Sequence, residues 1–362
     1  MIPLYKPYFT DDCFEHVQKA LDSKWIIWRG EYKDIVKNVL EKYLDIEHLL
    51  LLSNGTVACH LISKAVRLKY PNIKKIIVPN NVYIAAWNGF LFDGYFKLIP
   101  IDADIDTWNF DISKIDDYID EQTAVLVVHN LGNIVNVPKL QRKFPETIFV
   151  EDNCEGFSGE YENKKSGTQS FCSAISFCGN KIITSGEGGA LLVHNQDLYE
   201  YMFSLHCQGE SSKQYIHDKM GYNYRMTNIQ AAILYGQFEM LDEIKRKKTE
   251  LFDFYRKALS NKSRIVFQKN ENNTINAEWM MAIRVLGNVG YDYTKNYFNT
   301  RGVDIRPMFY PINYHPYLSN IKCETKNAEI LSRECFMIPS FPSITDSERC
   351  RVADVILSYI GN

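Results

Sequence analysis

The sequence has no long run of like charge, and its N-terminal part has no long apolar stretch. Lys and Arg number 41 and Asp and Glu number 44, so the formal net charge is only −3. Without a dense basic run, we expect neither nucleic acid nor an anionic membrane as a main partner. Residues 1–17 contain acids by position 11 and no apolar run, so neither a signal peptide nor a membrane span is expected.

Paired cysteine motifs are also missing. The nine cysteines are scattered along the chain, and none belongs to a Cys-x-x-Cys pair. An odd number of scattered thiols is typical of a reducing compartment, so we expect a cytoplasmic protein. The apolar fraction of 46% and the length of 362 residues suffice for one large domain and a smaller one.

A lysine between two apolar segments is the first candidate for chemistry. Residues 174–177 predict the end of a strand, Cys178 and Gly179 break it, and residues 190–193 form a second apolar run. Most lysines are solvated surface charges. An amine shielded from water loses its proton more readily and forms a Schiff base with a carbonyl. Lys181 is therefore either a surface charge or a Schiff-base lysine.

Two acids follow an earlier predicted strand. Residues 147–150 read as this strand, and Glu151 and Asp152 come directly after it. A pyridoxal phosphate site needs a lysine for the cofactor aldehyde and a carboxylate that keeps the pyridine nitrogen protonated. Asp152 and Lys181 indicate such a site, provided that a phosphate-binding segment accompanies them.

A strand-to-helix turn supplies that segment. Ser53-Asn54-Gly55-Thr56 separates a short apolar strand from a helix predicted from about Val57 to Lys69. Free N–H groups and the positive end of a helix dipole bind phosphate at such turns, although the same residues also serve ordinary turns. Strand and helix signals alternate around it, which predicts βαβ units and a largely parallel sheet with ligand groups at the strand ends.

An aromatic and basic segment near the N-terminus has two interpretations. Residues 23–30 combine tryptophan, isoleucine and basic residues, and they form either a loop that plugs the core or an interface.

A long charged helix predicted from Gln237 to Ala258 connects to a smaller C-terminal part. We therefore expect a large cofactor-binding domain at residues 1–240, which includes the N-terminal segment, and a small domain at residues 241–362.

Four ordered segments resemble the signatures of one enzyme family. These are SNGTVA, EDNCEGFSG, SFCGNK with TSGEGG, and GYNYRMTNIQAA. In order and spacing they resemble the DegT/DnrJ/EryC1/StrS family of pyridoxal-phosphate sugar aminotransferases over nearly the whole chain. Within it, KQYIHDKMGYNYRMTNI, IRPMFYPI and IPSFPS are most similar to perosamine synthases and related enzymes. One departure is HNLGNIVN, where relatives often have HLYG-x-P-x-D.

The resemblance implies the architecture. It is an α/β protein with the aspartate aminotransferase-like fold, or fold type I of pyridoxal-phosphate enzymes. A mostly parallel seven-stranded mixed sheet is sandwiched by helices, and a smaller α+β domain follows. The resemblance also implies a homodimer with shared active sites.

The resemblance implies roles for residues around the cofactor. Lys181 would form the Schiff base with pyridoxal 5'-phosphate and would be the catalytic acid and base. Asp152 would pair with the pyridine nitrogen. The phosphate would be held by Gly55, Thr56 and Ser176.

More distant contacts follow from the same resemblance. Tyr83 would stack on the cofactor ring, and Glu155 would lie near its phenolic oxygen. Asn223 would reach the phosphate of the partner subunit's cofactor. The candidate substrate contacts, each of which also fits an ordinary surface or core role, are Arg306, Tyr310 and His315. No metal is expected.

The implied activity is transfer of an amino group from L-glutamate to C4 of a nucleotide-linked 4-keto-6-deoxy sugar. The product is a 4-amino-4,6-dideoxy sugar nucleotide such as viosamine or perosamine. The alternatives are amination at C3 and a non-catalytic sugar-nucleotide-binding protein on the same fold. Some sugar dehydratases of this fold have histidine in place of the lysine, so Lys181 argues against that activity.

Overall fold

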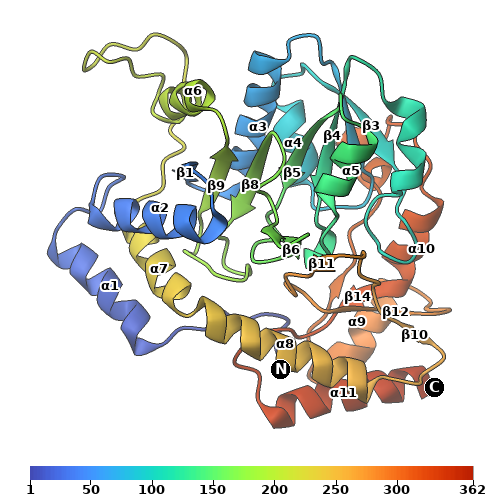
Figure 1. The fold of residues 1–362 in the computed structure, drawn as a ribbon. Helices are drawn as coiled ribbons and strands as arrows, with labels where there is room; N and C mark the ends of the chain where they lie inside the picture. The colour runs from blue at the N-terminus through green and yellow to red at the C-terminus, as the bar shows by residue number, and fades with distance from the viewer. Residues whose placement is uncertain (362) are drawn as a thin grey trace.

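A seven-stranded sheet forms the centre of the larger part of the molecule (Figure 1). The computed structural model describes residues 1–361; Asn362, the last residue of the expected small domain, lies outside them. The strands are β1 (His48–Leu52), β2 (Lys75–Pro79), β3 (Lys97–Ile101), β4 (Thr123–Val128), β5 (Ile148–Asp152), β8 (Cys172–Ser176) and β9 (Gly189–Val193). Their order is β1-β9-β8-β5-β4-β2-β3, and only β9 runs antiparallel to its neighbours. The expected mostly parallel seven-stranded mixed sheet is confirmed.

Helices cover both faces of this sheet, which explains why its strands are nearly continuous apolar runs. One face packs against α3 (Gly55–Lys69), α4 (Ala85–Leu91) and α6 (Gln196–His206). The other packs against α2 (Glu31–Leu44), α5 (Val137–Lys143) and α7 (Asn228–Glu239), and α1 (Asp11–Asp22) lies along α7. Every residue of β4 is buried. Because the parallel strands share one carboxyl edge, the residues that follow β2, β4, β5 and β8 lie together there.

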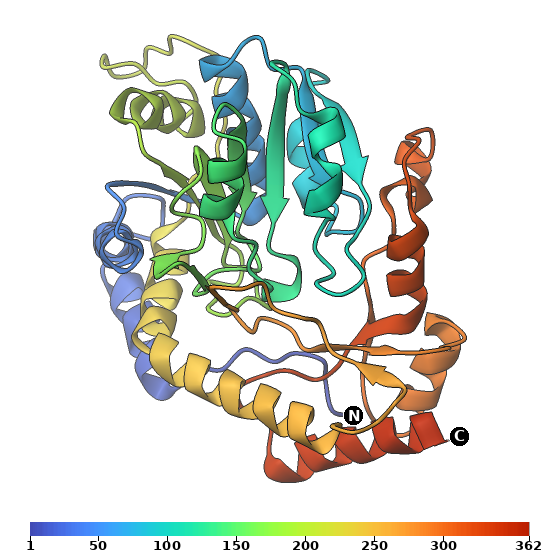
Figure 2. The same cartoon turned by 45° about the vertical axis from the view of Figure 1, so that its right-hand side comes forward.

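A second, smaller sheet lies in the C-terminal part of the chain. Its strands, in spatial order, are β10 (Ile265–Val266), β12 (Ala282–Val285), β14 (Cys335–Met337) and β13 (Arg306–Pro307). The helices of this part are α8 (Leu241–Ala258), α9 (Tyr291–Asn299), α10 (Lys326–Glu334) and α11 (Asp346–Gly361). Figure 2 shows α8 running along the base of the molecule, next to α11. A third sheet, β11 (Thr274–Ile275), β6 (Glu160–Tyr161) and β7 (Lys164–Lys165), joins the two parts.

The single helix predicted from Gln237 to Ala258 is two helices in the structure. α7 ends at Glu239 and α8 begins at Leu241. Met240 separates them with φ −95° and ψ 1°, and its N–H binds the carbonyls of Gln237 and Phe238. This tight turn caps α7, and Asp242 and Glu243 then lie in the first turn of α8, where negative charge stabilises the positive end of the helix dipole.

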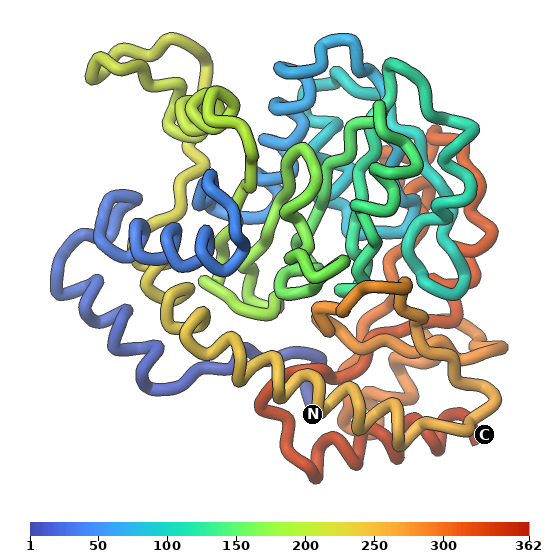
Figure 3. The backbone as a smooth tube through the Cα atoms, viewed as in Figure 1, coloured from blue at the N-terminus to red at the C-terminus, as the bar shows by residue number. Residues whose placement is uncertain are grey.

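The N-terminal segment pairs with the C-terminal part of the chain, as Figure 3 shows. Ile2 donates to the carbonyl of Gly302 at 2.7 Å and accepts from Asp304 at 2.9 Å. Leu4 accepts from the N–H of Ser340 at 3.0 Å. These contacts are remote in sequence, so the order of motifs along the chain did not indicate them. Among residues 1–361, the helices lack the length and apolar character needed to cross a membrane.

Candidate active site

The turn before α3 is pressed against the carboxyl ends of two strands. A Cβ atom at Gly55 would lie 2.8 Å from Cβ of Ser176 and 3.0 Å from Sγ of Cys154, so no larger residue fits there without displacement. Asn54 caps α3, because its side-chain oxygen accepts the N–H of Val57 at 3.0 Å. The first N–H groups of α3 have no partner within the helix, and they point toward this edge of the sheet.

Lys181 lies beyond β8 and is shielded from solvent. Its Nζ is 3.8 Å from Oε1 of Glu155, and its side chain is 13% exposed. The same Nζ lies 4.2 Å from the ring centre of Trp279. The backbone is held as well, because the hydroxyl of Tyr5 donates to the carbonyl of Lys181 at 2.6 Å. Of the two interpretations of this lysine, the structure supports the shielded amine.

Glu155 is a buried carboxyl group beside this amine. Its Oε2 accepts the N–H of Leu131 at 2.8 Å. Burial raises the pKa of Glu155 to about 7, although the charge of Lys181 and the N–H of Leu131 oppose the shift. Near neutral pH the group therefore exists in both protonation states and can either donate or accept a hydrogen bond.

Asp152 is the last residue of β5 and is buried. Its Oδ1 accepts the N–H of Cys154 at 3.0 Å, which orients the carboxylate at the strand end. Glu155 follows Asp152 by three residues and its carboxyl group lies beside Lys181, so the three groups lie in one region. Two carboxyl groups and one amine thus meet at the edge of the sheet that the sequence predicted.

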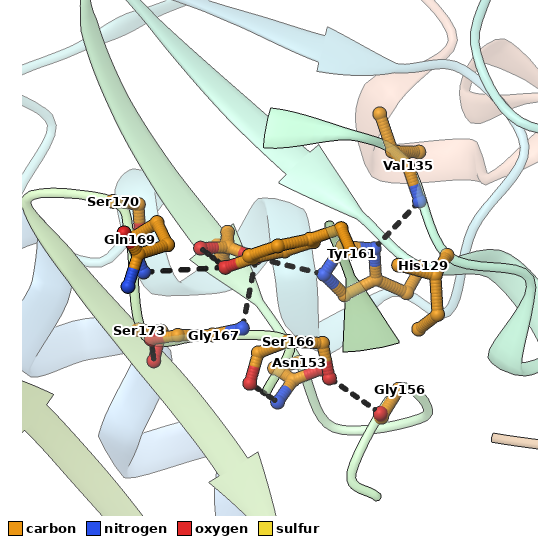
Figure 4. Close-up of polar contacts among 12 residues, drawn as sticks. His129, Val135, Asn153, Gly156, Tyr161, Ser166, Gly167, Gln169, Ser170 and Ser173 are labelled. Atoms are coloured by element: carbon orange, nitrogen blue, oxygen red, sulfur yellow. Dashed lines mark hydrogen bonds and ion pairs between the residues drawn. The ribbon is translucent and has the colours of Figure 1, made fainter. Parts of the chain in front are cut away.

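A buried hydrogen-bonded network fixes the end of β5 on its other face (Figure 4). Oε2 of Glu151 lies 2.8 Å from Nε2 of His129, and both side chains are fully buried. Nδ1 of His129 accepts the N–H of Val135 at 3.1 Å, so Nε2 carries the ring proton and donates to the carboxylate. Tyr161 donates its hydroxyl proton to Oε1 at 3.1 Å, and the N–H of Gly167 also binds Oε2. This network holds the ends of β4 and β5 together.

The remaining cofactor candidates are more exposed. Tyr83 is 60% exposed, and its ring centre lies 6.2 Å from that of Phe309. Thr56 is partly buried beside Gly55. Asn223 is exposed, and its side-chain oxygen accepts from the guanidinium of Arg225 at 3.0 and 3.1 Å.

The substrate candidates lie on a segment that reaches the large sheet from the C-terminal part of the chain. The N–H of Ile312 donates to the carbonyl of Asn80, just beyond β2, at 2.7 Å. Around this anchor, Tyr310 stacks on Tyr314 and His315 packs against Trp87, whereas Arg306 pairs with Asp304. Within residues 1–361, no hydrogen bond, ion pair or ring contact joins Lys181 to Tyr83, Asn223, Arg306, Tyr310 or His315.

Sequence reasoning missed Trp279, which holds the segment that carries Lys181. Its indole N–H donates to the carbonyl of Asn180 at 2.7 Å. Its own carbonyl accepts from Nζ of the buried Lys248 at 2.7 Å, and burial lowers the pKa of that lysine to about 7. Trp279 is therefore a positioning residue for Lys181. A tryptophan before an apolar strand was the only sequence signal, and nothing in its spacing relates it to the lysine.

The sequence of this chain matches a known protein family. The sequence profile of the DegT/DnrJ/EryC1/StrS aminotransferase family matches residues 7–357. The chain belongs to this family. It is 32% identical over 365 residues to GDP-perosamine synthase of Escherichia coli O157:H7, covering 100% of this chain and 99% of that protein. It is 30% identical over 372 residues to GDP-perosamine synthase of Vibrio cholerae, with both chains covered completely.

The fold also matches solved structures of similar proteins. One is Escherichia coli GDP-4-keto-6-deoxy-D-mannose-3-dehydratase with bound hydrated pyridoxal phosphate. It has a TM-score of 0.88 and 20% identity, and the match covers 98% of this chain and 99% of that one. As a member of the family, the protein is an aminotransferase, and its cofactor is pyridoxal phosphate.

Proposed function

We propose that the protein transfers the amino group of L-glutamate to C4 of a GDP-linked 4-keto-6-deoxy sugar. The observation that carries the proposal is the shielded amine of Lys181 beside Glu155, in a chain that aligns over its full length with two GDP-perosamine synthases. The products would be 2-oxoglutarate and a GDP-linked 4-amino-4,6-dideoxy sugar.

The residues at the carboxyl edge of the sheet fit pyridoxal phosphate. The buried carboxylate of Asp152 suits a protonated ring nitrogen, and the N–H groups of Gly55 and Thr56 suit a phosphate. Because Gly55 has no Cβ, the turn can lie against Ser176, whose hydroxyl would complete the phosphate ligands. When bound, the cofactor supplies an aldehyde for amines and an electron sink for the carbanion.

Lys181 moves the protons of both half-reactions. In the first, its Nζ takes a proton from the α-carbon of the amino donor. In the second, Nζ delivers a proton to C4 of the sugar. Glu155 has a pKa of about 7, so it can hold the proton of a hydrogen bond to the phenolic oxygen of the cofactor. Tyr83 would cover the cofactor ring, and Arg306, Tyr310 and His315 would contact the nucleotide sugar.

The proposal includes a homodimer in which the two copies share active sites. Trp25, Ile26 and Ile27 are each at least half exposed, so residues 23–30 do not plug the core of their own chain. Tyr215 and Met220, in the segment before Asn223, are 83% and 85% exposed. A second copy that covers these apolar side chains would bring its cofactor to Asn223.

The test is the identity of the product. The cofactor-loaded protein is incubated with L-glutamate and 4-keto-6-deoxy and 3-keto-6-deoxy sugars linked to GDP, UDP or dTDP, and the products are analysed by mass spectrometry and NMR. We expect an amine at C4 on the GDP sugar. Lys181→Ala should lose both the visible absorbance of the bound cofactor and turnover. An amine at C3, or turnover by the Lys181→Ala variant, would overturn the proposal.

A further inference from the structure

Two thiols that have no role in the proposed reaction form a cluster with the carboxylate of Asp152. The sulfur atoms of Cys59 and Cys154 and a carboxylate oxygen of Asp152 all lie within 4.8 Å of one another. Cys59 comes from the second turn of α3 and is 1% exposed, and Cys154 follows the end of β5. Cys59 lies on α3, Asp152 is the last residue of β5, and Cys154 follows two residues later with its N–H bound to Oδ1 of Asp152.

The spacing of these atoms suits a small thiophilic cation. Zinc binds thiolate sulfur at about 2.3 Å and carboxylate oxygen at about 2.0–2.2 Å. Tetrahedral ligands at those distances are about 3.5–3.8 Å apart, and the three atoms here lie within 4.8 Å of one another, so a small adjustment of the side chains would bring them to a cation. Two sulfurs and one oxygen form a soft donor set that hard cations such as Mg²⁺ do not favour. A water molecule would take the fourth position.

We propose that Cys59, Cys154 and Asp152 bind one thiophilic divalent cation, such as Zn²⁺ or Cd²⁺, in the cofactor-free protein. Binding converts both thiols to thiolates and releases two protons, with no change in oxidation state. The inference that this cation competes with pyridoxal phosphate rests on the proposed function, because it requires Asp152 to pair with the pyridine nitrogen. A divalent cation bound to this carboxylate neutralises its charge and repels a protonated ring nitrogen, so each partner weakens the binding of the other.

The thiols stay protonated until a cation arrives. The pKa of Cys154 is raised well above its usual value by its hydrogen bond to Cys59, by burial and by the charge of Asp152. The pKa of Cys59 is also raised: its hydrogen bond to Cys154 lowers it, but burial and Asp152 outweigh this effect. Protonated, buried thiols react slowly with oxidants, so the pair persists as thiols. A metal ion overcomes the cost by forming two metal–sulfur bonds.

The direct test is a titration of the full-length, cofactor-free protein with Cd²⁺. The readouts are the ultraviolet thiolate-to-metal charge-transfer band and calorimetry. We expect one tight site per chain. Cys59→Ala and Cys154→Ala should each weaken it by at least about tenfold, the loss that even indirect metal contacts cause. Cys335→Ala is the matched control, because this thiol is as buried as that of Cys59 but lies in the small sheet.

The outcomes separate the inference from the proposed function. Equal Cd²⁺ binding by the wild type and both cluster variants, or no charge-transfer band, would overturn the metal site and leave the aminotransferase proposal standing. In a second experiment, Cd²⁺ is bound first and pyridoxal phosphate is then added. Slower appearance of the visible absorbance, reversed by a chelator and absent in Cys154→Ala, supports competition. Unchanged cofactor loading on the Cd²⁺-bound protein would refute competition and leave the aminotransferase proposal standing.

Discussion

The ionisation of Glu155 should make the stability of the cofactor-free protein depend on pH. Burial raises the pKa of this carboxyl group from 4.5 to about 7. Between these values the folded protein binds more protons than the unfolded chain, so the free energy of unfolding falls as pH rises. The shift corresponds to about 3 kcal/mol in total, of which about 2 kcal/mol falls between about pH 5.5 and 8.5.

Replacing Glu155 with glutamine removes the ionisation but keeps the shape of the side chain. We expect the free energy of unfolding of Glu155→Gln, relative to the wild type, to increase by about 2 kcal/mol between about pH 5.5 and 8.5. The assay is urea-induced unfolding of the cofactor-free proteins, followed by circular dichroism. Glu162→Gln is the control, because the ordinary pKa of a glutamate already lies below this range and Arg142 lowers the pKa of Glu162 further. If the difference in the free energy of unfolding between Glu155→Gln and the wild type stays constant to within about 0.5 kcal/mol over this range, burial does not raise the pKa of Glu155.

Two more contacts can be tested by unfolding of the cofactor-free protein. A double-mutant cycle with Trp279→Leu and Lys181→Met should give a favourable coupling energy of about 0.5–2 kcal/mol, because the ammonium lies over a partly desolvated ring. A coupling energy near zero would contradict this cation–π contact. His129→Ala removes a neutral donor from the buried carboxylate of Glu151 and should destabilise the protein by about 1.5–3 kcal/mol, the contribution of a hydrogen bond to a charged group. Adding Glu151→Gln removes that charge and should restore part of the loss; a further loss in the double variant would show that the carboxylate does not depend on the imidazole.

The central sheet could be predicted because its signals are local. Apolar runs such as residues 124–128 and 190–193 specify buried strands, and the helical segments between most of the strands predict a largely parallel sheet. Once a parallel sheet was expected, the residues after β5 and β8 had to share one edge. This is why Asp152 and the segment before Lys181 could be placed together from the sequence.

The break at Met240 was not predictable in the same way. Residues 237–258 include many strong helix formers, and no glycine or proline interrupts them. The turn is set by packing, since α7 lies along α1 and α2 whereas α8 packs on α11 in the C-terminal part. Tertiary contacts outweigh propensities that differ by only a few tenths of a kcal/mol per residue.

By itself, the sequence determined the fold class, the family and the order of the chemical groups along the chain, because these depend on short-range pattern and on motifs within single segments. Only the tertiary structure decided how Lys181 is shielded. The ring of Trp279 and the hydroxyl of Tyr5 come from segments about 100 and 176 residues away, and no periodicity links such positions. The tertiary structure also brought Cys59 and Cys154 together, because their sulfur atoms become neighbours only when α3 packs beside the end of β5.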